Sequence, residues 1–187
     1  MVLAGLIAVL GFVIFLWRTG ELGAFYYHAV GIHFYKARLY KESKSDIPDT
    51  RANSLSRLAK DFGELGPALD AMTNDPSPQV RSRMASSLSG WPLIAANFED
   101  KKKILTALLI AMTEDRDPEV RYSASFGIKQ SAVILKDKLS PESYEEIATL
   151  SIPYLEKAVV INDRGSGKEY AQEALWIFEN GSIELTH

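Results

Sequence analysis

One stretch of this sequence occurs twice, with an offset of 40 residues and no gap. Residues 71–81 and 111–121 both begin Ala-Met-Thr, reach an aspartate at their fifth position and end Pro-x-Val-Arg. An apolar-periodic run precedes each aspartate and another follows each Val-Arg pair. Side chains of Asp75, Ser77, Asp115 or Asp117 can cap the second helix, whose first turn tolerates proline because it needs no amide donor there. Each copy therefore predicts a helical hairpin, and its repetition predicts an α-solenoid.

Two weaker copies flank this pair. Upstream, Pro48 to Arg51 aligns with Pro78 to Arg81, and downstream a helix over residues 168–179 follows one that ends near residue 163. The pattern Asp-x-x-Pro-x-Val-Arg followed by small apolar residues resembles the HEAT family, and within it the short HEAT-like repeats of the phycobilisome-lyase type. The resemblance covers about residues 46–180. It implies an all-α fold that presents a curved surface to another macromolecule.

The arginine that closes each copy also has an expected role under this resemblance. If Arg81 and Arg121 follow the HEAT pattern, their guanidinium groups reach acidic or carbonyl acceptors in the turn of an adjacent repeat. They would then be structural residues and not binding residues.

The first 17 residues contain no charged or polar side chain. As a helix they would extend about 25 Å, which is a short but sufficient membrane span. The alternatives are a cleaved signal peptide and a buried helix, but nothing basic precedes the apolar run and no small-residue cleavage site follows it. We expect an uncleaved anchor over residues 1–19, with Trp17 at the membrane interface and Arg18 reaching the headgroups.

Residues 20–45 are expected to form an aromatic and basic juxtamembrane segment and linker. Phe25, Tyr26 and Tyr27 suit the headgroup region of a bilayer. This segment either lies on the membrane or packs on the solenoid, which we expect over residues 46–187. The positive-inside bias of the residues that follow the span places the N-terminus outside and the repeats on the cytoplasmic side of a single-pass membrane protein.

Composition argues against several function classes. The chain has no cysteine and three histidines, of which His28 and His33 are five residues apart and do not converge on a helix, while His187 is the last residue. We therefore expect no metal site, no cofactor and no enzymatic activity. The chain carries a net charge of −3, and residues after Lys60 hold 13 basic against 20 acidic side chains. The run Lys101 to Lys103 is expected to be the solvated start of a helix, and no nucleic-acid partner is predicted.

The register of the two copies predicts which side chains face the core and which face outward. In the second helices, the predicted core positions are Val80, Met84, Ala85 and Leu88, and Val120, Ala124, Ser125 and Ile128. Positions 82, 83, 86, 122, 123 and 126 are expected to point outward.

Two of the outward positions carry aromatic rings. We expect Tyr122 and Phe126, with Arg83 nearby, to bind a partner protein, because rings on a wet face are typical interface anchors. The alternative is that the N-terminal aromatic segment or a long connection over residues 136–142 covers both rings. These features favour a membrane-anchored scaffold or accessory subunit of a larger membrane complex, bound to protein partners and lipid. The alternative that the resemblance suggests is a lyase or chaperone that handles a prosthetic group.

Overall fold

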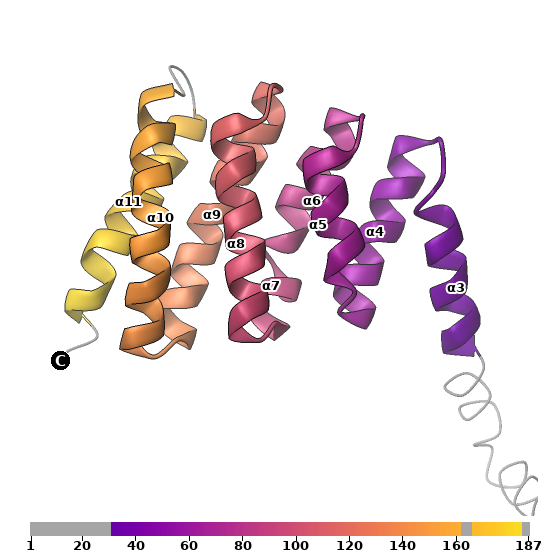
Figure 1. Ribbon diagram of the computed structural model, residues 1–187, viewed down its shortest axis with the longest axis horizontal. Helices are drawn as coiled ribbons and strands as arrows, with labels where there is room; N and C mark the ends of the chain where they lie inside the picture. The colour runs from indigo at the N-terminus through magenta and orange to yellow at the C-terminus, as the bar shows by residue number, and fades with distance from the viewer. Residues whose placement is uncertain (1–30, 162–165, 185–187) are drawn as a thin grey trace, which may run out of the picture. The chain divides into compact units, whose positions relative to one another are not determined.

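The computed structural model describes residues 31–161 and 166–184, and all regular structure in these residues is helical (Figure 1). The all-α prediction is therefore confirmed. The chain divides into two compact units, Met1–Lys41 and Glu42–His187. The predicted anchor over residues 1–19 and the interface residues Trp17, Arg18, Phe25, Tyr26 and Tyr27 lie outside the described residues. Among the residues that are described, no helix is long and apolar enough to cross a membrane.

Helix α3 (Ile32–Glu42) makes up most of the described part of the first unit. It occupies the second half of the segment in which a juxtamembrane helix is expected. The next helix begins at Pro48. Proline at this position sets the backbone angle of the first helical turn without removing a needed donor.

The helices of the second unit pack in two rows. One row contains α4 (Pro48–Phe62), α6 (Pro78–Leu88), α9 (Pro118–Lys138) and α11 (Ser166–Glu184), each packed against the next. The other contains α5 (Leu65–Asn74), α8 (Phe98–Glu114) and α10 (Pro141–Ile161). Helices α5, α8 and α10 pack against α6, α9 and α11, so the apolar core lies between the two rows (Figure 1). The short helix α7 (Trp91–Ala95) lies in the connection between α6 and α8.

The core positions predicted from the repeat register are confirmed. All eight are buried: Val80, Met84, Ala85, Leu88, Val120, Ala124, Ser125 and Ile128. Ser123, which was expected to point outward, is also buried, so that prediction was wrong. Its hydroxyl lies 2.7 Å from that of Ser82 on α6. The second helices therefore bury part of their surface against each other, in addition to the part that packs against the first helices.

Paired arginine and aspartate side chains join the turns of successive hairpins. Arg51 on α4 bonds to both carboxylate oxygens of Asp75 at 2.6 and 2.8 Å, and Arg81 on α6 bonds to both oxygens of Asp115 at 2.7 and 2.9 Å. Each aspartate follows the first helix of the next hairpin and also accepts a bond from the backbone amide two residues on. We call these two pairs the arginine ladder. This geometry confirms the expected contact of Arg81 with an acidic acceptor in the next turn.

The three arginines at the matching position of the repeats also bond within their own turns. Arg51, Arg81 and Arg121 donate from Nη1 to the backbone carbonyl six residues earlier. The donor–acceptor distance is 2.8 Å for both Arg81 and Arg121. The recurrence of this bond at Arg51 supports the degraded first copy. The turn after α10, residues 162–165, lies outside the described residues, so the expected contact of Arg121 with an adjacent repeat is not described.

The lysine run at the start of α8 is only partly solvated. Lys101 is buried, contrary to prediction, and its ammonium group donates to the carbonyls of Ile94 and Ala96 at the end of α7. Burial lowers the pKa of Lys101. The neighbouring Lys102 and Lys103 are more exposed and pair with Glu146 and Asp100. The prediction failed at Lys101 because a helix as short as α7 leaves carbonyls that a cationic side chain can satisfy.

A buried tyrosine joins the last two helices. The Tyr144 hydroxyl on α10 donates to the Ile177 carbonyl at 2.8 Å, and its ring stacks on Phe178 with centroids 5.8 Å apart. Burial raises the pKa of Tyr144 to about 12. A Cβ at Gly181 would lie 2.4 Å from the Tyr144 hydroxyl oxygen, so only glycine fits at this position.

Removing one arginine of the ladder is expected to destabilise the protein strongly. Arg81→Ala leaves the Asp115 carboxylate, whose side chain is 9% exposed, without its counter-charge. Breaking a buried pair from one side costs about 3 to 5 kcal/mol, and we expect a loss near the lower end because Asp115 keeps its backbone bond. Urea unfolding followed by circular dichroism measures the change. Arg83→Ala is the matched control on the same helix: its contact with Asp49 is 3.9 Å long and exposed, so the loss is expected to stay below about 1 kcal/mol.

The ladder also predicts loss of stability in acid. Burial of the Asp75 and Asp115 carboxylates raises their pKa, but the hydrogen bonds and positive charge of Arg51 and Arg81 outweigh it, and both pKa values lie below the ordinary range. Carboxyls whose folded pKa is depressed contribute their full stability above the unfolded value of about 3.9. That contribution is lost as the pH falls through the lower folded values.

Measuring the free energy of unfolding between about pH 6 and pH 2 tests this expectation. The wild-type protein is expected to lose stability across the acid part of the range. Asp115→Asn is expected to be less stable at neutral pH and to show a shallower acid decline. Parallel curves for the two proteins would contradict the assignment of acid sensitivity to this carboxylate.

Candidate functional site

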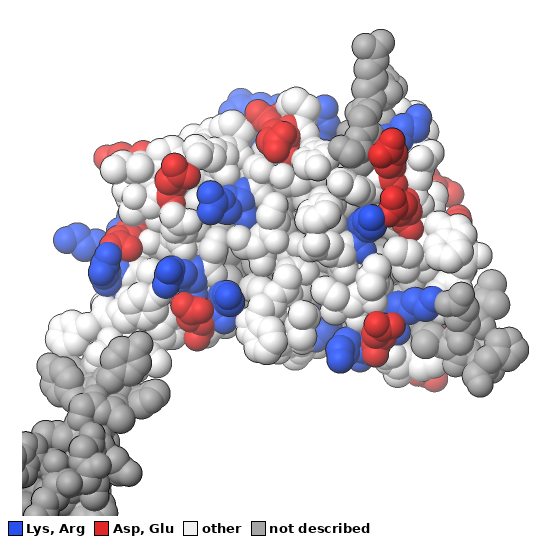
Figure 2. Space-filling model, turned by 180° about the vertical axis from the view of Figure 1, so that it is seen from behind, with Lys and Arg blue, Asp and Glu red and all other residues white. Residues whose placement is uncertain are grey.

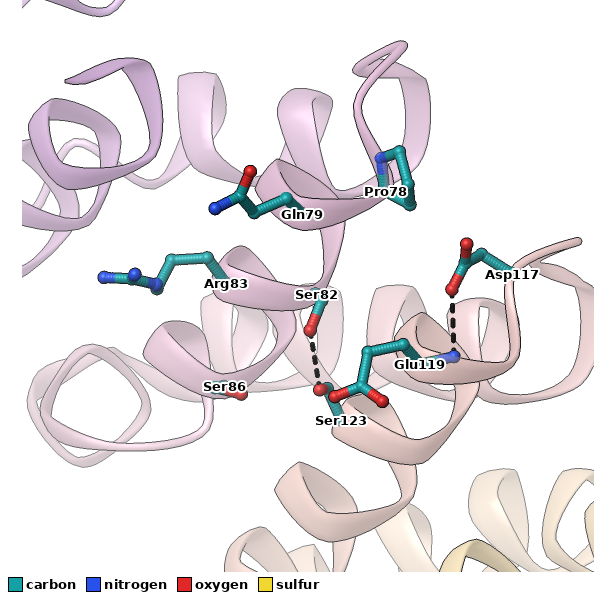
Figure 3. Close-up of a pocket in the computed structure, with 8 residues that line it drawn as sticks. All are labelled: Pro78, Gln79, Ser82, Arg83, Ser86, Asp117, Glu119 and Ser123. Carbon is teal, nitrogen blue, oxygen red and sulfur yellow. Dashed lines mark hydrogen bonds between the residues drawn. The ribbon is translucent and has the colours of Figure 1, made fainter. Parts of the chain in front are cut away.

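The row of second helices carries a polar hollow between α6 and α9. Its volume is about 550 Å³, and it is lined by Pro78, Gln79, Ser82, Arg83, Ser86, Asp117, Glu119 and Ser123 (Figure 3). The floor is formed by the short side chains of Ser82 and Ser123, which bond to each other where the two helices approach. At its rim, Asp117 caps α9 by accepting from the amide of Glu119 at 2.9 Å. The hollow therefore offers hydroxyl, carboxylate and guanidinium groups to a ligand from two successive hairpins.

Small residues let α6 and α9 approach each other below the hollow. A Cβ at Gly127 would lie 3.1 Å from the Cβ of Ser89 and 3.2 Å from the carbonyl oxygen of Ala85. Ser89, Ser123 and Ala85 are buried at the same seam. The small size of these residues allows the close approach of α6 and α9 beneath the hollow.

Arg83, one of the three predicted partner-binding residues, lies in this hollow (Figure 3). Its Nη1 donates to Asn53 on α4 at 3.1 Å, and its Nη2 lies 3.9 Å from Asp49. On the same helix, Gln79 donates to Asp49 at 2.9 Å. The guanidinium thus spans α4 and α6 and is held toward the N-terminal side of the hollow, although it remains exposed.

The other two predicted residues, Tyr122 and Phe126, form an aromatic cluster with Tyr170. The ring of Tyr170 on α11 lies 5.7 Å from Tyr122 and 5.3 Å from Phe126, measured between centroids. The ammonium of Lys129 lies 5.1 Å above the Tyr170 ring and also pairs with Glu173. Tyr122 remains 36% exposed and Phe126 is half-buried. A hydrogen bond with Tyr122 raises the pKa of Tyr170.

Of the two covers considered from sequence, the long connection is excluded, and the N-terminal aromatic segment falls largely outside the described residues. Helix α9 ends at Lys138 and α10 begins at Pro141, so the long connection over residues 136–142 does not exist. The rings instead meet a residue of the last helix. Tyr170 was missed because the fourth copy lacks the Pro-x-Val-Arg signature, and without it the outward positions of α11 cannot be aligned with those of α9.

Charge is distributed unevenly over this face. Figure 2 shows it from behind, with the middle of the surface mostly uncharged and basic and acidic side chains to either side. The pair of Arg83 with Asp49 and the pair of Lys129 with Glu173 come from the two ends of the row. The surface between them contains the serines of the hollow and the aromatic cluster.

Metal binding depends on how the acidic, histidine and cysteine side chains of the described residues are grouped. Within residues 31–161 and 166–184, no three side chains of histidine, cysteine, aspartate or glutamate are grouped so as to hold a metal ion. Comparison with known proteins gives no match: no family model, no curated protein and no solved structure is similar to this chain.

A substitution at Tyr170 tests how the aromatic cluster is held. Tyr170→Ala removes two ring–ring contacts and one cation–ring contact, and we expect it to lower the free energy of unfolding by about 1 to 3 kcal/mol. Tyr170→Phe keeps the ring contacts and is expected to lose much less. Equal effects of the two substitutions in thermal unfolding would show that the hydroxyl, and not the ring packing, stabilises the cluster.

Proposed function

We propose that this chain is a membrane-anchored scaffold or accessory subunit that binds partner proteins of a larger membrane complex. In this proposal residues 46–187 form a HEAT-like α-solenoid, residues 1–19 form its single transmembrane helix, and the repeats are cytoplasmic. The observation that carries the proposal is the continuous face of α6, α9 and α11, where a polar hollow lies beside half-exposed aromatic rings.

The geometry of the turns supports the solenoid part of the proposal. The arginine ladder repeats the same two contacts from one hairpin to the next, and packing proceeds between neighbouring hairpins. Repeat proteins with such nearest-neighbour packing use one row of helices as an extended binding surface. The apolar residues 1–17 support the anchor, and the basic residues after them support the cytoplasmic placement.

The binding residues that we propose are Tyr122, Phe126 and Arg83. An aromatic ring that is partly packed and partly exposed is a favourable anchor, since little side-chain entropy remains to be lost when a partner covers it. Arg83 is similarly restrained by Asn53 and Asp49 while its charge remains accessible.

Truncation of both rings tests the proposal. Tyr122→Ala with Phe126→Ala is expected to weaken partner binding by about 2 kcal/mol or more, which is about 30-fold in the dissociation constant. The measurement is quantitative recovery of partner proteins with the tagged full chain from mild detergent, followed by affinity measurement with the partner identified. Val160→Ala, which removes an exposed apolar side chain from α10 in the other row, is the matched control.

Thermal unfolding of the same variants separates binding from folding. A lower melting temperature with unchanged partner affinity would show that the rings serve only the fold, and would overturn their assignment as binding residues.

An absorption spectrum of the purified chain tests the alternative function. A coloured small molecule that stays with the protein would favour the handling of a prosthetic group over the scaffold.

A further inference from the structure

Helix α7 corresponds to the second half of a helix that is continuous in the next copy. At the 40-residue offset, Gly90, Trp91 and Pro92 align with Gln130, Ser131 and Ala132 inside α9. Helix α6 ends at Leu88, and α7 begins at Trp91 with a proline in its first turn. Pro92 cannot donate the amide bond that a continuous helix would need at this point, and Gly90 favours a change of direction.

The break changes which side chains are exposed. Ser131 is fully buried in α9, whereas Trp91 at the matching position is 58% exposed. Ile94, three residues later and therefore on the same side of α7, is 40% exposed. Pro92 and Leu93 point the other way and are buried. One side of α7 is thus part of the core and the other presents two large apolar side chains.

Helix α7 is held firmly despite its short length. Leu93 is fully buried, and the amide of Ala96 closes the last turn on the Pro92 carbonyl at 3.1 Å. The buried ammonium of Lys101 donates to the carbonyls of Ile94 and Ala96, and the Ile94 contact is 3.3 Å long. Trp91 and Ile94 are therefore presented by a rigid support, so their exposure is a property of the fold.

A basic residue lies beside this apolar pair. Lys60 on α4 and Trp91 line the same cleft of about 230 Å³, together with Asn97 and Asp100. The Asp100 carboxylate already accepts bonds from Lys103 and Asn97, each 2.9 Å long. Lys60 is exposed, and its ammonium group can reach an anion next to the indole.

We propose that α7 is a second membrane contact, in which Trp91 and Ile94 enter the interface of a lipid bilayer and Lys60 lies among the lipid phosphates. Tryptophan and lysine are the residues that favour this region, the first through its amphipathic ring and the second by snorkelling. Two side chains offer too little area for a stable protein interface, which needs about 800 Å² on each partner. A contact with a bilayer needs no minimum area of this kind, because it adds to an existing attachment. The inference rests on the proposed membrane anchor.

Depth-dependent quenching of tryptophan fluorescence tests this contact with the full chain. The chain contains three tryptophans, so Trp17→Phe with Trp176→Phe leaves Trp91 alone, and Trp17→Phe with Trp91→Phe leaves Trp176 alone. Trp176 is 59% exposed, which makes it a matched control for Trp91. Both proteins are reconstituted into phosphatidylcholine vesicles, with and without phosphatidylserine, that carry bromine atoms on their acyl chains.

The expected result is a blue shift and loss of emission for Trp91 and no change for Trp176, with a smaller effect after Lys60→Glu in the vesicles that contain phosphatidylserine. Unquenched Trp91, or equal quenching of both tryptophans, would overturn the proposal. If an unquenched Trp91 is nevertheless shielded from solvent in native membranes, α7 contacts a protein partner instead. An alkaline wash of the vesicles tests the anchor separately. Protein that resists the wash with Trp91 unquenched refutes only the α7 contact. Protein that is washed off refutes the anchor, and with it the second contact that rests on it.

Discussion

The two hydrogen bonds from one guanidinium to one aspartate in the next turn hold the hairpins in register. Asp115 receives both bonds from Arg81 and a third from the backbone amide of Asp117, so most of its acceptor capacity is used. Taking two charges out of water is expensive, and a pair of this kind adds little net stability unless every group is bonded. The planar fork of arginine fits a carboxylate in one orientation only, so the bidentate pair also fixes the orientation of one turn relative to the next.

The same register places the second helices side by side, and the size of their side chains decides what the face offers. Between α6 and α9 the contact residues are serine, alanine and glycine, and the helices leave a polar hollow. Between α9 and α11 the contact residues are aromatic, and the rings of Tyr122, Phe126 and Tyr170 fill the seam. One structural repeat thus yields two chemically different surfaces next to each other, and both belong to the proposed binding site.

The strongest predictions from sequence concerned the parts of the chain that repeat without a gap. The 40-residue offset aligns Val80 with Val120 and Ala85 with Ser125, and burial follows from that alignment. The contact of Arg81 was expected from the resemblance to HEAT repeats, and its acceptor Asp115 lies in the turn of the next copy. Periodicity within one helix identifies the side that faces the core, but it does not show which residues meet the neighbouring helix.

The failures lie where a residue depends on a contact between helices or on a break in the repeat. Ser123 was misplaced because its partner Ser82 belongs to another hairpin. Lys101 was predicted to be solvated because the sequence does not reveal the carbonyls at the end of α7 that accept its hydrogen bonds. The proline and glycine that create α7 are visible in the sequence, but the exposure of Trp91 follows only from the path of the chain after the break.

The spacing of the ladder has a consequence for the order in which the chain folds. Arg51 and Asp75 are 24 residues apart and Arg81 and Asp115 are 34 apart, so each pair closes a short loop. Short loops cost little entropy to close, and chains with local contacts fold rapidly. Because each arginine also bonds the carbonyl six residues before it, its guanidinium is already oriented when the next turn arrives. Structure can then spread from either central hairpin to its neighbours during synthesis, without waiting for the chain to be complete.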